Sequence, residues 1–254
     1  MKSNEKYLGF IFLWFVIWTT PLQAQKNVQL SETASRQSLN LQLNIGFNTF
    51  AVGDVENLYQ DILQTYRARN IPVPTQREFP GNVLLGIEVM YDIPALFNIG
   101  LASYYTWSRA FSRYEDFSGK LDVNSKVSLL ALQAILQKDL VRKGSWHPFV
   151  DIRGGLAYGW LEFTEDIRFN ELSELNGSSI LSANGVGFVV EGYLGAKYLA
   201  MGFDISAQAG YRYGKITEPD AELKVDNQLQ SSGKIALDIN FSGLVVLLSV
   251  GKTL

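Results

Sequence analysis

One stretch of the chain, residues 202–217, alternates apolar and polar side chains along its whole length. Its apolar row ends in Tyr211 and Tyr213, and its polar row consists of small residues apart from Asp204, Gln208 and Arg212. A period of two is the pattern of a β-strand with one apolar and one polar face. The stretch therefore predicts a strand whose apolar face meets lipid and whose polar face lines a narrow lumen.

Seven further stretches repeat this pattern, although two of them are less clear. In 125–138 the lipid-facing row is ambiguous, and Gln133 and Gln137 favour Leu130, Leu132 and Leu136 as the residues that face lipid. In the first half of the last stretch, the residues expected to face lipid are Ile235, Leu237, Ile239 and Phe241. A bulge at Gly243 would then let Leu244, Val246, Leu248 and Val250 face lipid in the second half. The eight predicted strands are 38–50, 82–92, 98–110, 125–138, 148–163, 185–198, 202–217 and 234–251.

The connections between these strands alternate between long and short. Eight antiparallel strands with both ends in the periplasm produce this order. The predicted fold is all-β, an eight-stranded antiparallel up-and-down transmembrane β-barrel. Its long outer loops are expected at 53–81, 111–124, 164–184 and 218–233.

The first long loop has a helical pattern in its first half, with Asp54 as a plausible N-cap. Pro72, Pro74 and Pro80 exclude regular structure from its second half. The segment is either a lid or docking helix at the barrel mouth or a surface loop that packs on itself. We favour the second interpretation.

The amino end has the pattern of a cleaved secretory signal. Lys2 and Lys6 precede an apolar run of ~12 residues, which is too short to span a membrane, and Ala24 is a suitable cleavage site. The expected organisation is a signal peptide at 1–24, a periplasmic lead-in at 25–37 and the barrel at 38–254, located in the cell outer membrane. The chain contains no cysteine, so it has no disulfide and no thiolate metal site.

Two observations favour a membrane barrel over a soluble ligand-binding barrel. The inward rows carry glycine, alanine and serine with isolated charges, whereas a solvent-facing row should be rich in lysine, glutamate and threonine. Aromatic residues also gather at both strand ends, where they would form two belts at the membrane interfaces. The predicted belt residues are Tyr91, Tyr105, Trp107, Trp146, Tyr158, Trp160, Tyr198, Tyr211 and Tyr213.

On these strands, belts and alternating connections, residues 38–254 resemble the small eight-stranded outer-membrane barrels of the OmpA transmembrane, OmpX and OmpW kind. The resemblance implies membrane lipid, lipopolysaccharide and the outer-membrane assembly machinery as partners, and a monomer. Such barrels usually end on an aromatic residue, whereas this sequence ends on Leu254. Either the assembly signal lies within 244–250 or the assembly is less standard.

Eight charged residues are expected to point into the lumen: Glu88, Asp92, Asp151, Arg153, Glu191, Lys197, Asp204 and Arg212. They form either an ion or proton path or a salt-bridged network that fills a closed lumen, and we favour the network. Asp204 and Arg212 lie too far apart along their strand to pair with each other. Lys197 is the first candidate partner for Asp204.

His147 is the only histidine and is predicted in a periplasmic turn, where a structural role is favoured over catalysis. No G-x-S-x-G or H-E-x-x-H pattern occurs, and no cofactor or metal site is predicted. Acidic residues gather in the outer loops at Glu162, Glu165, Asp166, Glu171, Glu174, Asp220, Glu222 and Asp226. These residues either bind divalent cations that bridge lipopolysaccharide or form a solvated acidic face, which we favour.

The formal net charge of −3 argues against nucleic-acid binding. The leading hypothesis is a non-enzymatic outer-membrane scaffold whose surface loops interact with the envelope or with partners. The alternative is a narrow pore or a conduit for small or apolar molecules, as in the OmpW resemblance. A lipid-modifying barrel enzyme is a weaker third hypothesis.

Overall fold

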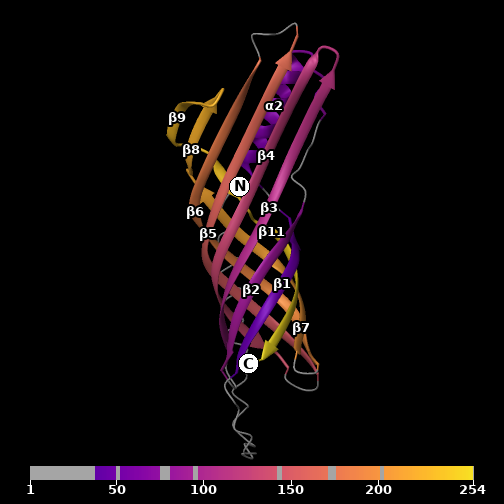
Figure 1. The fold of residues 1–254 in the computed structure, drawn as a ribbon. Coiled ribbons are helices and arrows are strands. Elements are labelled where there is room, and N and C mark those ends of the chain that lie inside the picture. Colours follow the sequence, from indigo (N-terminus) through magenta and orange to yellow (C-terminus); the bar gives the residue numbers. More distant parts are fainter. Residues whose placement is uncertain are drawn as a thin grey trace, which may run out of the picture. The chain divides into compact units, whose positions relative to one another are not determined.

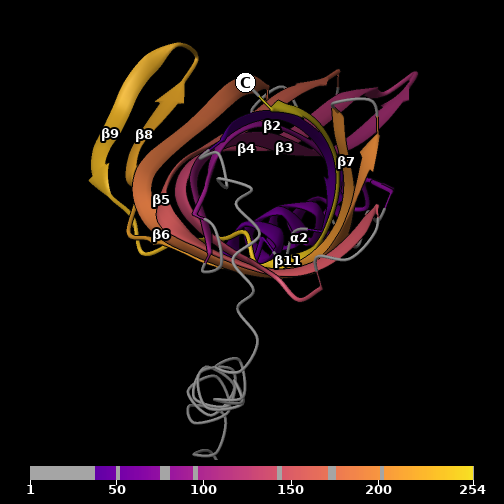
Figure 2. The same cartoon turned by 90° about the horizontal axis from the view of Figure 1, so that it is seen from below.

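Eight antiparallel strands close into a ring. Figure 1 shows this ring from the side, and Figure 2 shows it from below. The computed structural model describes residues 38–49, 52–74, 81–93, 97–141, 145–170, 176–200 and 203–253, so the predicted signal peptide and lead-in lie outside the described residues. In ring order the strands are β1 (Leu39–Asn48), β2 (Asn82–Asp92), β3 (Asn98–Asp116), β4 (Gly119–Asp139), β5 (Trp146–Phe169), β6 (Gly177–Ala200), β7 (Phe203–Thr217) and β11 (Gly243–Thr253). Because β11 pairs with both β7 and β1, the ring is closed, and the predicted barrel is confirmed.

The exterior of the ring is apolar because alternate residues of every strand point outward. Leu43, Leu132 and Leu194 are 64%, 63% and 68% exposed, values that a water-soluble surface would not repeat on strand after strand. A closed ring also satisfies its own backbone hydrogen bonds, as a lipid environment demands. On β4, Leu130 is exposed and Leu129 is buried, which confirms the predicted facing of that strand.

Strands β3 to β6 continue well beyond the rest of the ring, at the end that we call the outer end. β3 and β4 meet at a turn at 117–118, and β5 and β6 reach Phe169 and Gly177. Much of the predicted loops 111–124 and 164–184 is therefore strand, and these two predictions were wrong. The period-two pattern is concealed there because the outward row is charged while the inward row, with Leu121 and Val123, is apolar.

The predicted loop 218–233 is also mostly strand. It forms a hairpin of β8 (Asp220–Val225) and β9 (Gln228–Lys234), and β8 pairs with the outer part of β6. The hairpin therefore widens the sheet beyond the barrel wall, as Figure 1 shows.

The start of the predicted last strand and the facing of its first half were wrong, whereas its second half, from Leu244 to Val250, faces outward as predicted. The segment after β9 contains the short β10 (Asp238–Asn240), and β11 begins only at Gly243. Asn240 pairs with Lys215 and Gly243 with Arg212, so two residues separate these pairs on both strands and no bulge interrupts the register.

The residues that were expected to face lipid in this segment lie inside the barrel. Leu237, Ile239 and Phe241 are buried, and Ile235 packs against the same apolar cluster. The prediction failed because it assumed a polar lumen throughout, whereas the outer part of this lumen is apolar.

The apolar interior is completed by one helix, α2 (Asp54–Ala68), which lies behind β4 and β5 in Figure 1 and within the ring in Figure 2. Its buried residues Val55, Tyr59, Leu63 and Tyr66 belong to one cluster with inward residues of the strands. The favoured interpretation of this segment as a loop that packs on itself was therefore wrong.

The helix begins differently from the prediction. Gly53 occupies the N-cap with a φ of 59°, a conformation that glycine adopts readily. The carboxylate of Asp54 instead accepts a hydrogen bond of 3.0 Å from the backbone N–H of Asp238, which links the helix to β10. Within the described part of the chain, no helix is long and apolar enough to cross a membrane.

Candidate functional site

The centre of the lumen contains a buried ion network around Arg153, which is 2% exposed. Its Nη1 lies 2.6 Å from Oε1 of Glu88, and its Nη2 lies 2.5 Å from Oδ2 of Asp151. Tyr104 donates a hydrogen bond to Glu88 and also contacts the Arg153 guanidinium. Arg153 is on β5 and Glu88 is on β2, three strands away around the ring, so this ion pair crosses the lumen.

A second buried pair lies beside the first. Nε of Arg212 donates to Oε1 of Glu191, and the hydroxyl of Tyr193 donates to Oε2 of Glu191 over 2.7 Å. The Arg153 guanidinium lies 4.7 Å from the centre of the Tyr193 ring, a cation–π distance that joins the two pairs. Five of the eight charges expected in the lumen thus belong to one cluster, together with two tyrosines. They are Glu88, Asp151, Arg153, Glu191 and Arg212.

Tyr104 and Tyr193 are parts of this cluster that the sequence analysis missed. Both lie on the inward, otherwise polar rows of their strands, and an aromatic residue in such a row was the available signal. The ring of Tyr104 occupies the space that a side chain at Gly86 of the neighbouring strand would need. A small residue on one strand therefore makes room for a large one on the next, which fills the lumen.

At the other end, which we call the periplasmic mouth, inward polar residues surround a hollow of about 250 Å³. Its lining includes Asp92, Asp139, His147, Lys197 and Asp204. His147 lies within β5 and not in a turn, because that strand already begins at Trp146. The predicted position of His147 in a turn was wrong, because β5 begins earlier than expected.

The charges of the periplasmic mouth pair differently from the expectation. Nζ of Lys197 lies 3.6 Å from Oδ1 of Asp139, and Asp204 accepts a hydrogen bond from the amide of Asn40. The expected direct ion pair between Lys197 and Asp204 is not present among the described residues, and Lys197 pairs with Asp139 of β4 instead. Among the described residues, no group of three or more histidine and acidic side chains is placed to hold a metal ion.

Beyond the ion network, towards the outer end, two tyrosines of α2 form hydrogen bonds to the strands of the barrel. Tyr59 donates to Oγ of Ser112 over 2.9 Å, and Tyr66 donates to Oε1 of Glu165. Burial raises the pKa of Tyr66, and the hydrogen bond to Glu165 raises it further. Burial also raises the pKa of Tyr59, so both hydroxyls keep the protons that these bonds need.

The residues predicted for the aromatic belts lie on the exterior of their strands and make two groups of ring contacts. Tyr105 stacks on Trp107 and Trp160, at 5.5 and 5.9 Å between ring centres, and Tyr158 contacts Trp160. At the periplasmic end, Trp146 lies 4.9 Å from Tyr198. Tyr91 is half-buried, and Tyr211 and Tyr213 are exposed.

Most of the described acidic residues of the outer end have partners of their own. Asp166 pairs with Arg168 of its own strand, Glu222 pairs with Lys224, and Asp226 accepts from the backbone N–H of Ser178. Glu162 is exposed and Glu165 is held by Tyr66. Glu171 and Glu174 lie outside the described residues.

The chain is similar to several solved structures, among them the following three. A major outer membrane protein from Thermus thermophilus has a TM-score of 0.52 at 11% identity, over 86% of this chain and 100% of that one. OprG from Pseudomonas aeruginosa has a TM-score of 0.44 at 15% identity, over 86% of this chain and 96% of that one. Ail of Yersinia pestis has a TM-score of 0.38 at 11% identity, over 86% of this chain and 99% of that one. At such TM-scores the second and third similarities add nothing to the fold assignment. No family model and no curated protein sequence matches the chain.

The closed ring, its apolar exterior and the first of these similarities define the class of the protein. It has the fold of the small eight-stranded outer-membrane β-barrels. Its particular role within the outer membrane is a separate question, since proteins of very different function share one fold.

Proposed function

We propose that this protein is a non-enzymatic outer-membrane scaffold with a closed lumen, and that it functions through its outer surface. The ion pair between Arg153 and Glu88 carries the proposal, because it spans the lumen from β5 to β2 with both side chains buried. Ions that passed this level would have to break a buried salt bridge and leave charges uncompensated.

The outer surface supports the second half of the proposal. β3 to β6 and the β8–β9 hairpin form a sheet that extends beyond the ring, and α2 packs against the inside of this sheet. Such a supported sheet is a rigid platform for contacts with lipids, lipopolysaccharide or surface partners. We further propose that the protein is a monomer that the outer-membrane assembly machinery inserts, and that His147 has a structural role.

A second candidate, a conduit for small apolar molecules, is supported by one observation. The outer part of the lumen is lined by apolar residues, among them Leu121, Val127 and Ile239, although the lumen of a transmembrane barrel is usually polar. In the structure α2 occupies this chamber, so a conduit would require the helix to leave it.

Flux through reconstituted vesicles distinguishes the two functions. For a closed scaffold, vesicles that contain the protein should release neither entrapped ions nor an apolar dye faster than protein-free vesicles. Dye transfer without ion flux would replace the scaffold by the conduit. Ion conductance that changes in Arg153→Ala would show an open pore and would contradict the closed lumen.

A further inference from the structure

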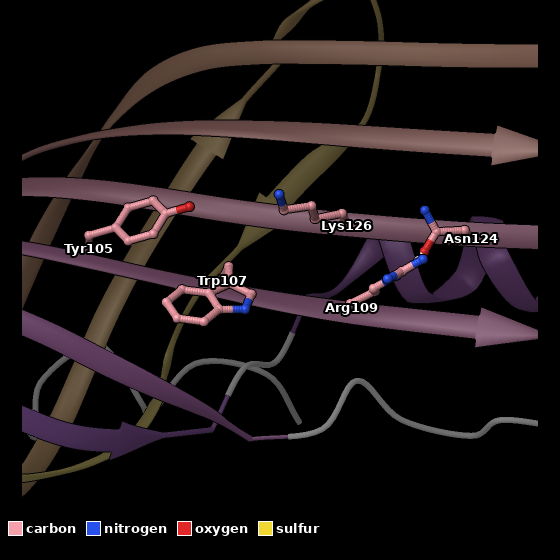
Figure 3. A pocket seen from close by; sticks show the side chains of 5 residues that line it. All are labelled: Tyr105, Trp107, Arg109, Asn124 and Lys126. Carbon is pink, nitrogen blue, oxygen red and sulfur yellow. Dashed lines mark hydrogen bonds between the residues drawn. The ribbon is translucent and has the colours of Figure 1, made fainter.

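The exterior of β3 and β4 has a hollow of about 500 Å³ just beyond the outer aromatic belt, lined by Tyr105, Trp107, Arg109, Asn124 and Lys126. Figure 3 shows the two aromatic side chains towards one end of this hollow and Arg109 with Asn124 towards the other, and Lys126 lies between the ends. Arg109 lies two positions beyond Trp107, which is ~7 Å along a strand. Because aromatic belts lie at headgroup level, the two cations lie at the depth of lipid phosphates.

The two cations of the hollow face each other directly. Arg109 pairs with Lys126 in the register of β3 and β4, and like charges directly opposite in an antiparallel pair are destabilising. Four residues further along β3, Arg113 pairs with Asp122, which is the expected compensated arrangement, and their ion pair measures 2.6 Å. The uncompensated pair therefore needs a negative charge that this register does not supply.

One carboxylate faces this pair from the other side of β4. Glu162 is opposite Lys126 on β5, but no nitrogen–oxygen distance within 4 Å joins them in the described part of the chain. By contrast, Lys120 lies 2.5 Å from Asp122, and Arg168 lies 3.2 Å from Asp166. The row of Arg109, Lys126 and Glu162 thus contains one more cation than carboxylate, and neither cation forms an ion pair in the described part of the chain.

The Arg109 side chain is also held in position. Its Nε donates to Oδ1 of Asn124 over 2.5 Å, and its guanidinium lies 5.6 Å from the centre of the Phe111 ring. These contacts leave the terminal nitrogens to form hydrogen bonds with a phosphate, for which a planar guanidinium is well suited. Below the belt, the exterior of the same two strands is apolar, with Leu101 and Leu132 more than 60% exposed.

We infer that this hollow binds the phosphate headgroup of an anionic outer-leaflet lipid, whose acyl chains lie along Leu101 and Leu132. The inference rests on the proposed role of the outer surface in envelope contacts and names the partner. The two aromatic side chains of the hollow suit a lipid headgroup, and the two cations suit its phosphate. The apolar surface below suits the acyl chains of the same molecule. A free phosphate ion would use only the cations.

Native mass spectrometry of the full chain in detergent tests the inference, with bisphosphorylated lipid A as the probe. The wild type should retain lipid A, and Arg109→Gln with Lys126→Gln should weaken binding by about tenfold or more, the size expected for lost charge-assisted hydrogen bonds. The matched control, Arg113→Gln with Lys120→Gln, changes two cations that both form an ion pair with Asp122, and it should bind as the wild type does. Glu162→Gln removes the one nearby carboxylate and should strengthen binding.

Three results would overturn the inference. The first is that the variant with both Arg109→Gln and Lys126→Gln binds lipid A as well as the wild type does. The second is that the wild type retains phosphatidylcholine as well as lipid A. The third is that inorganic phosphate displaces lipid A at a concentration similar to that of the lipid. Retention of the folded form on unheated electrophoresis excludes misfolding as the cause of lost binding. Because this assay does not measure flux, its failure leaves the closed lumen untouched, and a conducting lumen leaves the lipid site untouched.

Discussion

Arg153 shows how a single residue can close a lumen. It contacts two carboxylates, one hydroxyl and two aromatic rings, and it comes from a strand that does not neighbour β2, where Glu88 lies. Desolvating so many charges is costly, and an arrangement of this kind persists only when each charge has a partner. The network is therefore sensitive to the loss of any one member.

Replacing Arg153 should reveal this sensitivity. We expect Arg153→Met to lower the free energy of unfolding by about 3–5 kcal/mol, because Glu88 and Asp151 would remain buried without their cation. Urea unfolding in lipid vesicles, followed by tryptophan fluorescence, measures the change. Arg168→Met is the control, since the Arg168 side chain is largely exposed in its ion pair with Asp166. A loss no larger than that of the control would contradict the role of the network.

At the scale of an element, α2 is the part of the structure that departs most from a simple barrel. Its buried face packs against inward residues of the strands, and Tyr59 and Tyr66 hydrogen-bond to Ser112 and Glu165. The helix thus replaces the water that would otherwise fill the outer part of the lumen. Its docking depends on apolar burial along one face of the helix.

Truncating this face should release the helix. Leu63 is fully buried, and Leu63→Ala should cost about 2–5 kcal/mol of packing free energy. We expect the amide hydrogens of α2 to exchange at least ~10-fold faster, while those of the ring strands stay protected. Gln64→Ala, at the neighbouring exposed position, is the control and should leave exchange unchanged. Equal protection of α2 in both variants would show that Leu63 does not hold the helix.

At the scale of the whole molecule, the barrel is organised by two surfaces of opposite character. The exterior is apolar between the two aromatic groups, whereas the lumen is charged at its centre and apolar towards the outer end. The exterior needs lipid for its stability, since large apolar side chains on every strand of the ring are exposed.

The dependence on lipid should vary with depth. Leu132 lies midway along the apolar part of β4, and Leu132→Arg should cost about 2–4 kcal/mol of stability in bilayers. Leu140, one residue beyond the periplasmic end of β4, is similarly exposed, and Leu140→Arg should cost only about 0–1 kcal/mol. Reversible folding into vesicles measures both values. Equal costs would mean that the assumed position of the membrane is wrong.

The sequence by itself determined the eight strands of the ring and the outward or inward facing of most of their residues. It could do so because a period of two is a local property, and because lipid selects one row of each strand. All eight charges that were expected in the lumen lie on the inner side of their strands, from Glu88 at the centre to Asp92 at the periplasmic mouth.

Only the tertiary structure decided which of these charges meet and what fills the outer lumen. Arg153 and Glu88 are 65 positions apart, and their contact depends on ring closure and strand stagger, which leave no trace in local periodicity. The same holds for Leu237, Ile239 and Phe241, whose facing reversed because α2, distant in sequence, makes the interior apolar. The uncompensated pair of Arg109 and Lys126 became visible only once the register of β3 and β4 was known. Contacts between strands depend on how the chain closes on itself, and no single strand contains that information.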